Sequence, residues 1–231
     1  MTFQPRLTQR RSQAKSSSSS AAAESAKRKA EVTPFAPTQE QMEEHRSGRV
    51  TGANRKPGDL DKAAMIDRFL RVDHAGEFGA VRIYEGQIAV LKRRSANLGV
   101  LNHMLEQEEV HLETFKTLGA QRRARPTLMH PIWHVAGFAL GAGTALMGEK
   151  AAMACTAAVE EVIDEHYQKQ YDALGDDELP LKATIETFRQ EEVEHRDIGY
   201  RNGAEEAPAY PLLSRVIKTG CKAAIWVSER V

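Results

Sequence analysis

Two short sequences of the form Glu-x-x-His contain the residues of this chain that are best suited to metal chemistry. They are Glu108 with His111 and Glu192 with His195. Side chains at positions i and i+3 are neighbours on one face of a helix, so each pair can offer a carboxylate oxygen and an imidazole nitrogen to one site. Two further glutamates stand at matching distances, because Glu77 lies 31 residues before Glu108 and Glu160 lies 32 residues before Glu192. The pattern predicts two copies of one ligand arrangement.

The charges of these six residues predict the kind of ion that they bind. A buried carboxylate costs several kcal/mol even after relaxation, and repulsion between neighbouring carboxylates raises their pKa values. Four carboxylates are balanced by two divalent cations. Mixed oxygen and imidazole ligation suits iron or manganese better than zinc or calcium. We therefore expect a two-metal site, and a buried polar network without metal is the alternative.

The six residues interrupt the apolar stripes of four predicted helices. These helices are expected from Asp59 to about Arg94, from Leu98 to Leu118 with a stop at Gly119, from Glu149 to Leu174, and from Pro180 to near Gly203. In the second helix, Leu101, Met104 and Phe115 recur at spacings typical of a core-facing stripe that also holds Glu108 and His111. Each half of the chain is thus a hairpin of two helices, the first with one glutamate and the second with a Glu-x-x-His pair. Two such hairpins related by an approximate two-fold axis would supply the ligand set of ferritin-like di-iron and di-manganese bundles.

Two additional helices are expected outside this four-helix bundle. The glycine-rich stretch 132–148 is apolar, and its uncharged part, 135–148, is too short to cross ~30 Å of hydrocarbon. The last helix, from Pro211 to about Glu229, has an apolar side and a basic side with Arg215, Lys218 and Lys222. Strand signals are nearly absent, so the predicted fold class is all-α. Both helices suit contact with a membrane surface, and packing within a soluble core or an oligomer interface is the alternative.

Composition defines the class of protein and its domains. The chain has 231 residues, 41% hydrophobic, 28% charged, with no net charge and a mean hydropathy of −0.50. These values exclude a polytopic membrane protein and a wholly disordered chain, and they give no reason to expect a nucleic-acid partner. Residues 1–30 hold seven Lys and Arg against one acid, Glu24, and a serine run, a pattern typical of a mitochondrial presequence. We expect leader and linker over 1–57 and one folded domain over 58–231. A plain disordered tail is the alternative.

Other polar residues near these motifs receive simpler interpretations. Glu109, Glu113, Glu161, Glu191 and Glu194 fall off the apolar stripes and are expected to be solvated. His130 and His134 are interrupted by Pro131 and are expected in a surface turn. Asp73 and Asp197 are candidates to orient the two histidines, and Gly76, Gly79 and Gly86 are expected to allow close helix approach around the metal site. The two cysteines, Cys155 and Cys221, are too few for a disulfide framework and are expected to be inert thiols.

Several longer stretches resemble the 5-demethoxyubiquinone hydroxylases of ubiquinone biosynthesis. They are residues 73–80, 137–146, 152–156, 191–199 and 228–230, and the similarity covers about residues 60–231. This resemblance implies that Glu108 and Glu192 bridge two irons. It also implies that Glu77 and His111 complete one iron and that Glu160 and His195 complete the other.

The resemblance further implies the reaction and its partners. The expected activity is O2-dependent hydroxylation of the demethoxyubiquinone ring, the penultimate step before ubiquinone, with NADH as electron donor. No Gly-x-Gly-x-x-Gly fingerprint marks a dinucleotide site in the sequence. His166 and Tyr167 resemble residues proposed to relay electrons or protons, and a packed tyrosine beside a surface histidine is the alternative.

The resemblance also implies a location in the cell, and the ligand pattern leaves two rival functions open. A polyprenylated quinone is taken from a bilayer, so we expect peripheral attachment to the matrix side of the mitochondrial inner membrane. A lipid-presenting partner protein within a biosynthetic complex is also expected. Two other functions use the same pattern differently: a ferritin-like protein that stores or oxidises iron, and a helical scaffold at the membrane without catalysis.

Overall fold

The structure, a computed structural model, describes residues 60–92 and 97–231, and within these ranges every regular element is helical. The long helices are α3 (Lys62–Leu91), α4 (Leu98–Arg122), α5 (His130–Leu146), α6 (Glu149–Ala173), α7 (Leu179–Arg201) and α8 (Tyr210–Ser228). Two short 3-10 helices, η1 (Asp176–Glu178) and η2 (Ala204–Glu206), flank α7. The all-α prediction is confirmed. The predicted leader and linker, Asp59 and Arg94 lie outside the described residues.

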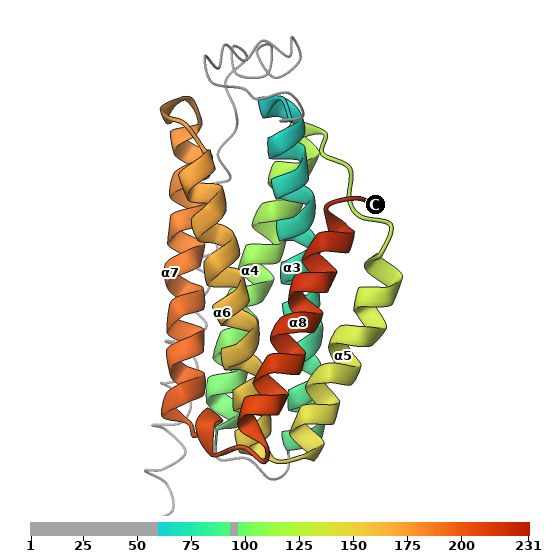
Figure 1. Cartoon of the computed structure of the whole chain (residues 1–231), viewed down its shortest axis with the longest axis vertical. Coiled ribbons are helices and arrows are strands. Elements are labelled where there is room, and N and C mark those ends of the chain that lie inside the picture. The colour runs from blue at the N-terminus through green and yellow to red at the C-terminus, as the bar shows by residue number, and fades with distance from the viewer. Residues whose placement is uncertain (1–59, 93–96) are drawn as a thin grey trace, which may run out of the picture. The chain divides into compact units, whose positions relative to one another are not determined.

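The helices form a four-helix bundle with two additions. Figure 1 shows α3, α4, α6 and α7 running alongside one another, with α5 and α8 on one side of them. Within the bundle, α3 packs against α4 and α6 packs against α7, and outside it α5 packs against α3 and α8 against α6. This arrangement confirms the ferritin-like bundle of two hairpins with two additional helices.

Helix ends differ from the predictions where tertiary contacts intervene. The first described helix is capped by Asp61, whose side chain accepts a hydrogen bond from the Ala64 amide at 2.7 Å. Helix α4 continues past Gly119, the predicted stop, and ends at Arg122. The reason is a buried ion pair, because both terminal nitrogens of Arg122 donate to the Glu178 carboxylate at 3.1 and 2.7 Å. This pair ties the end of α4 to η1.

Apolar layers lie along the bundle on both sides of the predicted ligands. One layer surrounds Phe115, Tyr167 and Phe188, and the other surrounds Met104 and Met153. Polar side chains between two such layers are shielded from water. The predicted metal ligands therefore occupy a buried polar band within a continuous hydrophobic core.

Glycines bring α3 and α5 into close contact. A Cβ atom added at Gly141 would overlap the carbonyl oxygen of Ile83, and one added at Gly86 would overlap that of Phe138. Close helix approach was expected around the metal site, and that expectation is wrong in its location. The reason is that the close contact forms with α5, which supplies none of the predicted ligands, while Gly76 has ordinary packing room.

The outer faces of α5 and α8 remain apolar and exposed. Large side chains on them include Ile132, Val135, Leu212, Val216 and Trp226. The two helices are linked by the Trp133 indole, which donates to the Ser228 hydroxyl at 3.1 Å. None of the helices in the described part of the chain combines the length and hydrophobicity needed to cross a bilayer.

Candidate metal centre

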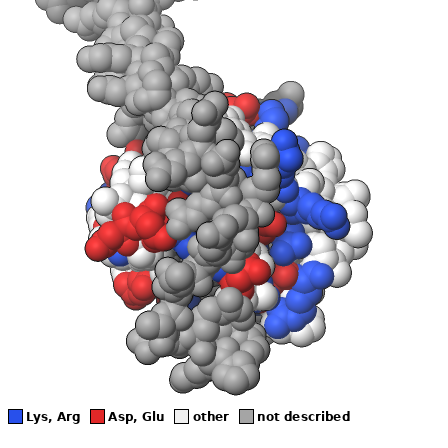
Figure 2. All heavy atoms as spheres, turned by 90° about the horizontal axis from the view of Figure 1, so that it is seen from above, with Lys and Arg blue, Asp and Glu red and all other residues white. Residues whose placement is uncertain are grey.

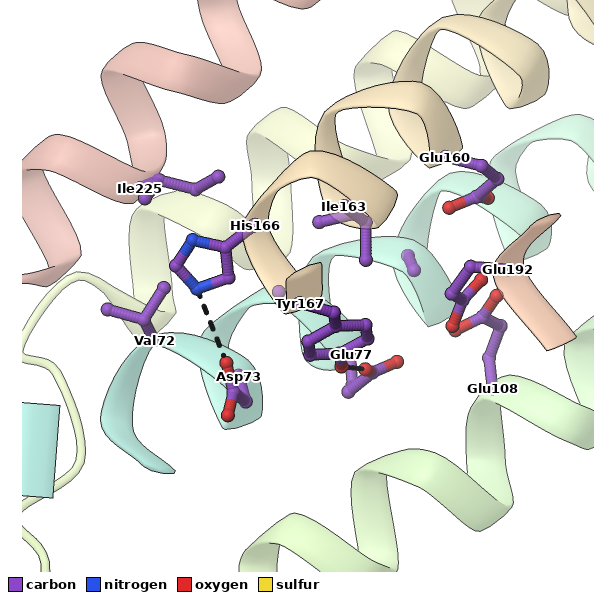
Figure 3. Close-up of a pocket in the computed structure, with 12 residues that line it drawn as sticks. Val72, Asp73, Glu77, Glu108, Glu160, Ile163, His166, Tyr167, Glu192 and Ile225 are labelled. Atoms are coloured by element: carbon purple, nitrogen blue, oxygen red, sulfur yellow. Dashed lines mark hydrogen bonds and ion pairs between the residues drawn. The ribbon is translucent and has the colours of Figure 1, made fainter. Parts of the chain in front are cut away.

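The structure brings all six predicted ligands together in the centre of the bundle. Helix α3 contributes Glu77, α4 contributes Glu108 and His111, α6 contributes Glu160, and α7 contributes Glu192 and His195. Each is at most 3% exposed. Figure 3 shows the four carboxylates converging from their separate helices. The six side chains therefore face the centre of the bundle, as the periodicity of their helices predicts.

The six side chains form two overlapping groups of four. One group consists of Glu77, Glu108, His111 and Glu192, and the other of Glu108, Glu160, Glu192 and His195. Within each group the potential ligand atoms all lie within 4.8 Å of one another. Glu108 and Glu192 belong to both groups, so these two carboxylates stand between two possible metal positions.

Several buried polar atoms of this cluster lack hydrogen-bond partners, and bound cations could take that place. The Nδ1 atoms of both histidines face the carboxylates, with His111 Nδ1 2.9 Å from Glu192 Oε1 and His195 Nδ1 3.1 Å from Glu108 Oε1. Despite these distances, both Glu108 oxygens, His111 Nδ1 and Glu192 Oε1 lack a hydrogen bond of normal geometry. Buried polar atoms without partners are rare and costly. Divalent cations would satisfy this oxygen- and nitrogen-rich donor set.

Burial and mutual repulsion dominate the electrostatics of the cluster. Burial, together with the charge of Glu192, raises the pKa values of Glu108 and Glu160 well above the ordinary range. Burial acts the same way on Glu192, but the adjacent His111 and His195 side chains lower its pKa to about 2. Burial alone would lower the pKa of His111, yet hydrogen bonds to acidic neighbours raise it. Without metal, the cluster therefore depends on bound protons.

Two residues that the sequence analysis did not select hold the outer edges of the histidine rings. Nε2 of His111 lies 2.7 Å from the Glu191 carboxylate, and Nε2 of His195 lies 3.1 Å from the Gln107 side-chain oxygen. Partners of this kind fix the ring orientation of a metal-binding histidine. The expectation that Glu191 is solvated is therefore wrong, because its position beside Glu192 brings it across the helix interface to His111. Each partner directly precedes a predicted ligand glutamate, a signal that was available in the sequence.

The two aspartates proposed for this orienting role lie elsewhere. Asp73 is buried but contacts Gln170 and His166 instead of the ligand histidines. Asp197 forms an ion pair with its neighbour Arg196. Both expectations are therefore wrong. Proximity in sequence to a ligand did not determine which face of the helix each aspartate occupies.

Two tyrosines donate hydrogen bonds across the bundle to Glu77 and Glu160, the two glutamates that belong to one group each. The hydroxyl of Tyr84 on α3 donates to Glu160 on α6 at 3.0 Å, and the hydroxyl of Tyr167 on α6 donates to Glu77 on α3. Each tyrosine follows the glutamate of its own helix by seven residues. This repeated spacing could have identified Tyr84 from the sequence. Burial and the nearby carboxylates raise the pKa values of both tyrosines, which therefore act as hydroxyl donors.

The approximate symmetry is broken beside Tyr167. His166 lies against Asp73, with Nε2 3.4 Å from the carboxylate, and close to Gln170 at 2.9 Å. A small cavity of about 20 Å³ reaches the carboxylates here, and Val72, Ile163 and Ile225 supply apolar walls (Figure 3). That volume holds about one water-sized molecule. The cavity gives the cluster an approach from the side of α8.

His130 and His134 lie away from the ligand cluster. They occupy the first turns of α5, where a surface turn was expected, because Pro131 suits the start of a helix. The His130 ring packs 4.8 Å from the rings of both His74 and Phe78. The interpretation that they are not ligands of the central site agrees with this geometry.

Comparisons with known proteins agree with the resemblance seen in the motifs. The family described as "Ubiquinone biosynthesis protein COQ7" matches residues 64–228. A Rhodospirillum rubrum protein named 3-demethoxyubiquinol 3-hydroxylase is 72% identical over 198 residues, covering 86% of this chain and 93% of the relative. A Mus musculus protein named NADPH-dependent 3-demethoxyubiquinone 3-hydroxylase, mitochondrial, is 53% identical in an alignment that covers 72% of this chain and 78% of the length of the mouse protein. The Saccharomyces cerevisiae 5-demethoxyubiquinone hydroxylase, mitochondrial, is 43% identical over 74% of this chain and 80% of its own. This chain therefore belongs to the COQ7 family of ubiquinone biosynthesis proteins.

Proposed function

We propose that this protein is an O2-dependent hydroxylase of the demethoxyubiquinone ring, acting in the penultimate step of ubiquinone biosynthesis. The observation that carries the proposal is the buried cluster of four carboxylates and two imidazoles in two overlapping groups. The names of the relatives support the substrate, since the R. rubrum, mouse and yeast proteins are all named as hydroxylases of demethoxyubiquinone or its quinol.

The proposed metals are two iron ions, with Glu108 and Glu192 as bridging ligands. Glu77 and His111 would complete one iron, and Glu160 and His195 the other. Iron bound there would supply the activation of O2. The protein contributes the dry apolar surroundings and fixes the ligand orientation through Glu191, Gln107 and the two tyrosines.

His166 and Tyr167 are proposed to act where the small cavity meets the cluster. Tyr167 donates to Glu77 and holds that carboxylate in place. His166 is partly exposed and contacts Asp73, so it can exchange protons between the cavity and the buried carboxyl. The aromatic head group of the quinone is proposed to approach from this side of the bundle, past the apolar wall that includes Ile225, and the cavity of about 20 Å³ itself has room only for a water-sized molecule.

The proposed electron donor is a reduced nicotinamide nucleotide. NADH is implied by the family resemblance, and the mouse relative is named as NADPH-dependent. Supplying each nucleotide separately in the assay distinguishes them.

The proposed location is the matrix side of the mitochondrial inner membrane, with the exposed faces of α5 and α8 against the lipid surface and a lipid-presenting partner protein in the same complex. The basic composition of residues 1–30 and the mitochondrial names of the mouse and yeast relatives support import. The alignment with the R. rubrum protein covers 86% of the chain, more than residues 58–231 can supply, so it extends into residues 1–57, the proposed leader and linker. Incubating the full chain with isolated mitochondria tests import directly. A chain that stays protease-sensitive outside the organelles refutes the mitochondrial location and leaves the enzymatic proposal intact.

The decisive experiment uses anaerobically reduced full-length protein. We expect about two irons per chain, by elemental analysis, and O2-dependent conversion of a short-tailed demethoxyubiquinone analogue. Glu192→Ala should lose both, whereas Glu194→Ala, which alters an exposed glutamate on the same helix, should retain both. Iron uptake into a large mineral without quinone conversion would instead support the ferritin-like alternative. Full function without bound transition metal would support the scaffold.

A further inference from the structure

A second and larger cavity lies apart from the metal cluster, near the end of the bundle where α4 leads into α5. Its volume is about 210 Å³. Its walls come from α3, α4 and the segment that follows α4, and they include Arg71, His74, Phe115, Lys116 and Arg125. Nothing in the reaction proposed above uses this cavity.

The cavity is lined by positive charge. Arg71, Lys116 and Arg125 line it, and no carboxylate does so among the described residues. The Nε atom of Arg71 is buried and lacks a hydrogen-bond partner. Lys116 reaches Glu113 at 2.8 Å, but this pair is exposed to solvent and is therefore weak. The cavity thus offers several donors and a local excess of positive charge to an anion.

The lowered pKa of His74 agrees with the positive charge around the cavity. Burial, followed by the nearby His130 and Lys116, lowers the pKa of His74 to about 4. The imidazole is neutral at pH 7 and adds a further polar group without adding charge. The floor beside it is apolar, because Leu70, Phe115, Ala124 and Pro126 also line the cavity. An anion attached to carbon suits this combination of groups.

The size of the cavity limits the ligand. Pockets that enclose drug-sized molecules have volumes of ~300–1,000 Å³. A volume of about 210 Å³ is below this range, which disfavours a whole dinucleotide. A phosphate group with the adjoining carbons of a lipid head group is a better match.

The surroundings of the cavity are those of a membrane contact. Two residues beyond Pro126, Leu128 is 84% exposed, and Ile132 and Val135 continue this exposed apolar surface along α5. The ring of His74, which lines the cavity, packs against His130 at the start of the same helix. Figure 2 views this end of the bundle and shows Lys and Arg side chains gathered along one side, next to uncharged residues. Basic side chains beside exposed apolar ones favour binding to anionic lipid.

We propose that this cavity binds the phosphate of an anionic phospholipid head group, while Leu128 and Ile132 enter the adjoining apolar layer. The site would orient the bundle on the bilayer from which the quinone is taken, and in this respect it rests on the proposed function. Arg71 and Arg125 supply donors to the phosphate oxygens, and Lys116 supplies additional charge.

The test measures binding of the full chain to phosphatidylcholine vesicles with and without about one third phosphatidylglycerol. Each cation near an anionic surface contributes ~1 kcal/mol, about fivefold in partition coefficient. The double variant Arg71→Gln/Arg125→Gln should therefore bind the anionic vesicles about 20- to 30-fold more weakly and bind pure phosphatidylcholine unchanged. The matched control Lys92→Gln/Arg201→Gln removes the same net charge from exposed positions outside the cavity lining and should bind nearly as wild type.

A second variant separates the cavity from diffuse surface charge. A Cβ atom added at Gly119, which lines the cavity, meets no heavy atom within 4 Å, so Gly119→Leu can occupy the space without removing charge or straining α4. We expect Gly119→Leu to weaken binding to anionic vesicles at least severalfold. Circular dichroism of each variant verifies folding.

Three results would overturn the proposal. They are unchanged vesicle binding by both cavity variants, binding of inorganic phosphate at the cavity that vesicles do not compete with, and NADPH binding that the cavity variants abolish. Conversion of a water-soluble quinone analogue should be the same in the cavity variants as in wild type. A protein that never converts this analogue refutes the proposed reaction, and vesicle binding still decides the lipid site.

Discussion

Replacing Glu108 by glutamine tests whether the buried carboxylates are kept for a metal. Glu108 is fully buried, neither of its oxygens has a hydrogen-bond partner, and burial and acidic neighbours raise its pKa. An amide of the same shape removes this ionisable group from the metal-free protein. Keeping a carboxyl group protonated at neutral pH costs the folded protein ~1.4 kcal/mol for each unit by which its pKa is raised, and glutamine avoids this cost. For a chain of this length, a gain of ~2 kcal/mol corresponds to a rise in Tm of ~4–8 °C.

The same substitution should have the opposite effect when metal is present. A metal at a hundred times its Kd stabilises the folded protein by ~2.7 kcal/mol. Glu108→Gln removes a carboxylate shared by both ligand groups, so most of this increment should be lost. Thermal unfolding, followed by circular dichroism under anaerobic conditions with and without ferrous ions, measures both effects. Glu106→Gln, at an exposed position on the same helix, serves as the control.

Either of two results would refute this reasoning. The first is a metal-free Glu108→Gln protein that unfolds at a lower temperature than wild type. The second is a metal-dependent increase in Tm equal to that of wild type. The first would mean that the carboxylate stabilises the fold without metal, and the second that the metal binds elsewhere.

Three further predictions address protons, hydrogen bonds and packing. Because the pKa values of Glu108 and Glu160 are raised, the folded metal-free protein binds more protons than the unfolded chain. Its free energy of unfolding, measured by urea titration, should therefore fall from about pH 5 to pH 8. A rise over this range would contradict the raised pKa values. Tyr84→Phe removes the hydroxyl that donates to Glu160 and should weaken metal binding about tenfold in chelator competition, whereas unchanged affinity would show that this hydrogen bond does not position the ligand. Gly141→Ala should lower the free energy of unfolding by ~1–3 kcal/mol because its Cβ overlaps α3, whereas Gly143→Ala, in open space on the same helix, should raise it by up to ~1 kcal/mol; equal effects would exclude the close contact.

The number of helices and the convergence of the six predicted ligands were predictable because both follow from local periodicity. The stripe containing Glu108 and His111 identifies the buried face of α4 without any knowledge of its neighbours. Where α4 ends was not predictable in the same way. The helix continues past Gly119 because Arg122 meets Glu178, which lies far along the chain.

Which acidic side chains contact the predicted ligand histidines depends on contacts between helices, and the sequence did not predict it. Asp73 and Glu191 both lie close in sequence to predicted ligands, yet only Glu191 reaches a predicted ligand histidine. The rotation of each helix about its axis decides which of these acids faces the partner helix. Periodicity within one helix cannot supply that rotation for a residue at the edge of a stripe.

The amino-acid sequence by itself determined the all-helical class, the two matching hairpins and the six inward-facing polar residues. Its motifs also indicated the family. Only the tertiary structure decided that Glu108 and Glu192 belong to both ligand groups, that Tyr84 and Tyr167 exchange hydrogen bonds across the bundle, and that a basic cavity forms beside Leu128. The physical reason is that spacing along a helix fixes the direction of a side chain relative to its own axis, whereas a contact across the bundle also requires the distance and rotation between two axes.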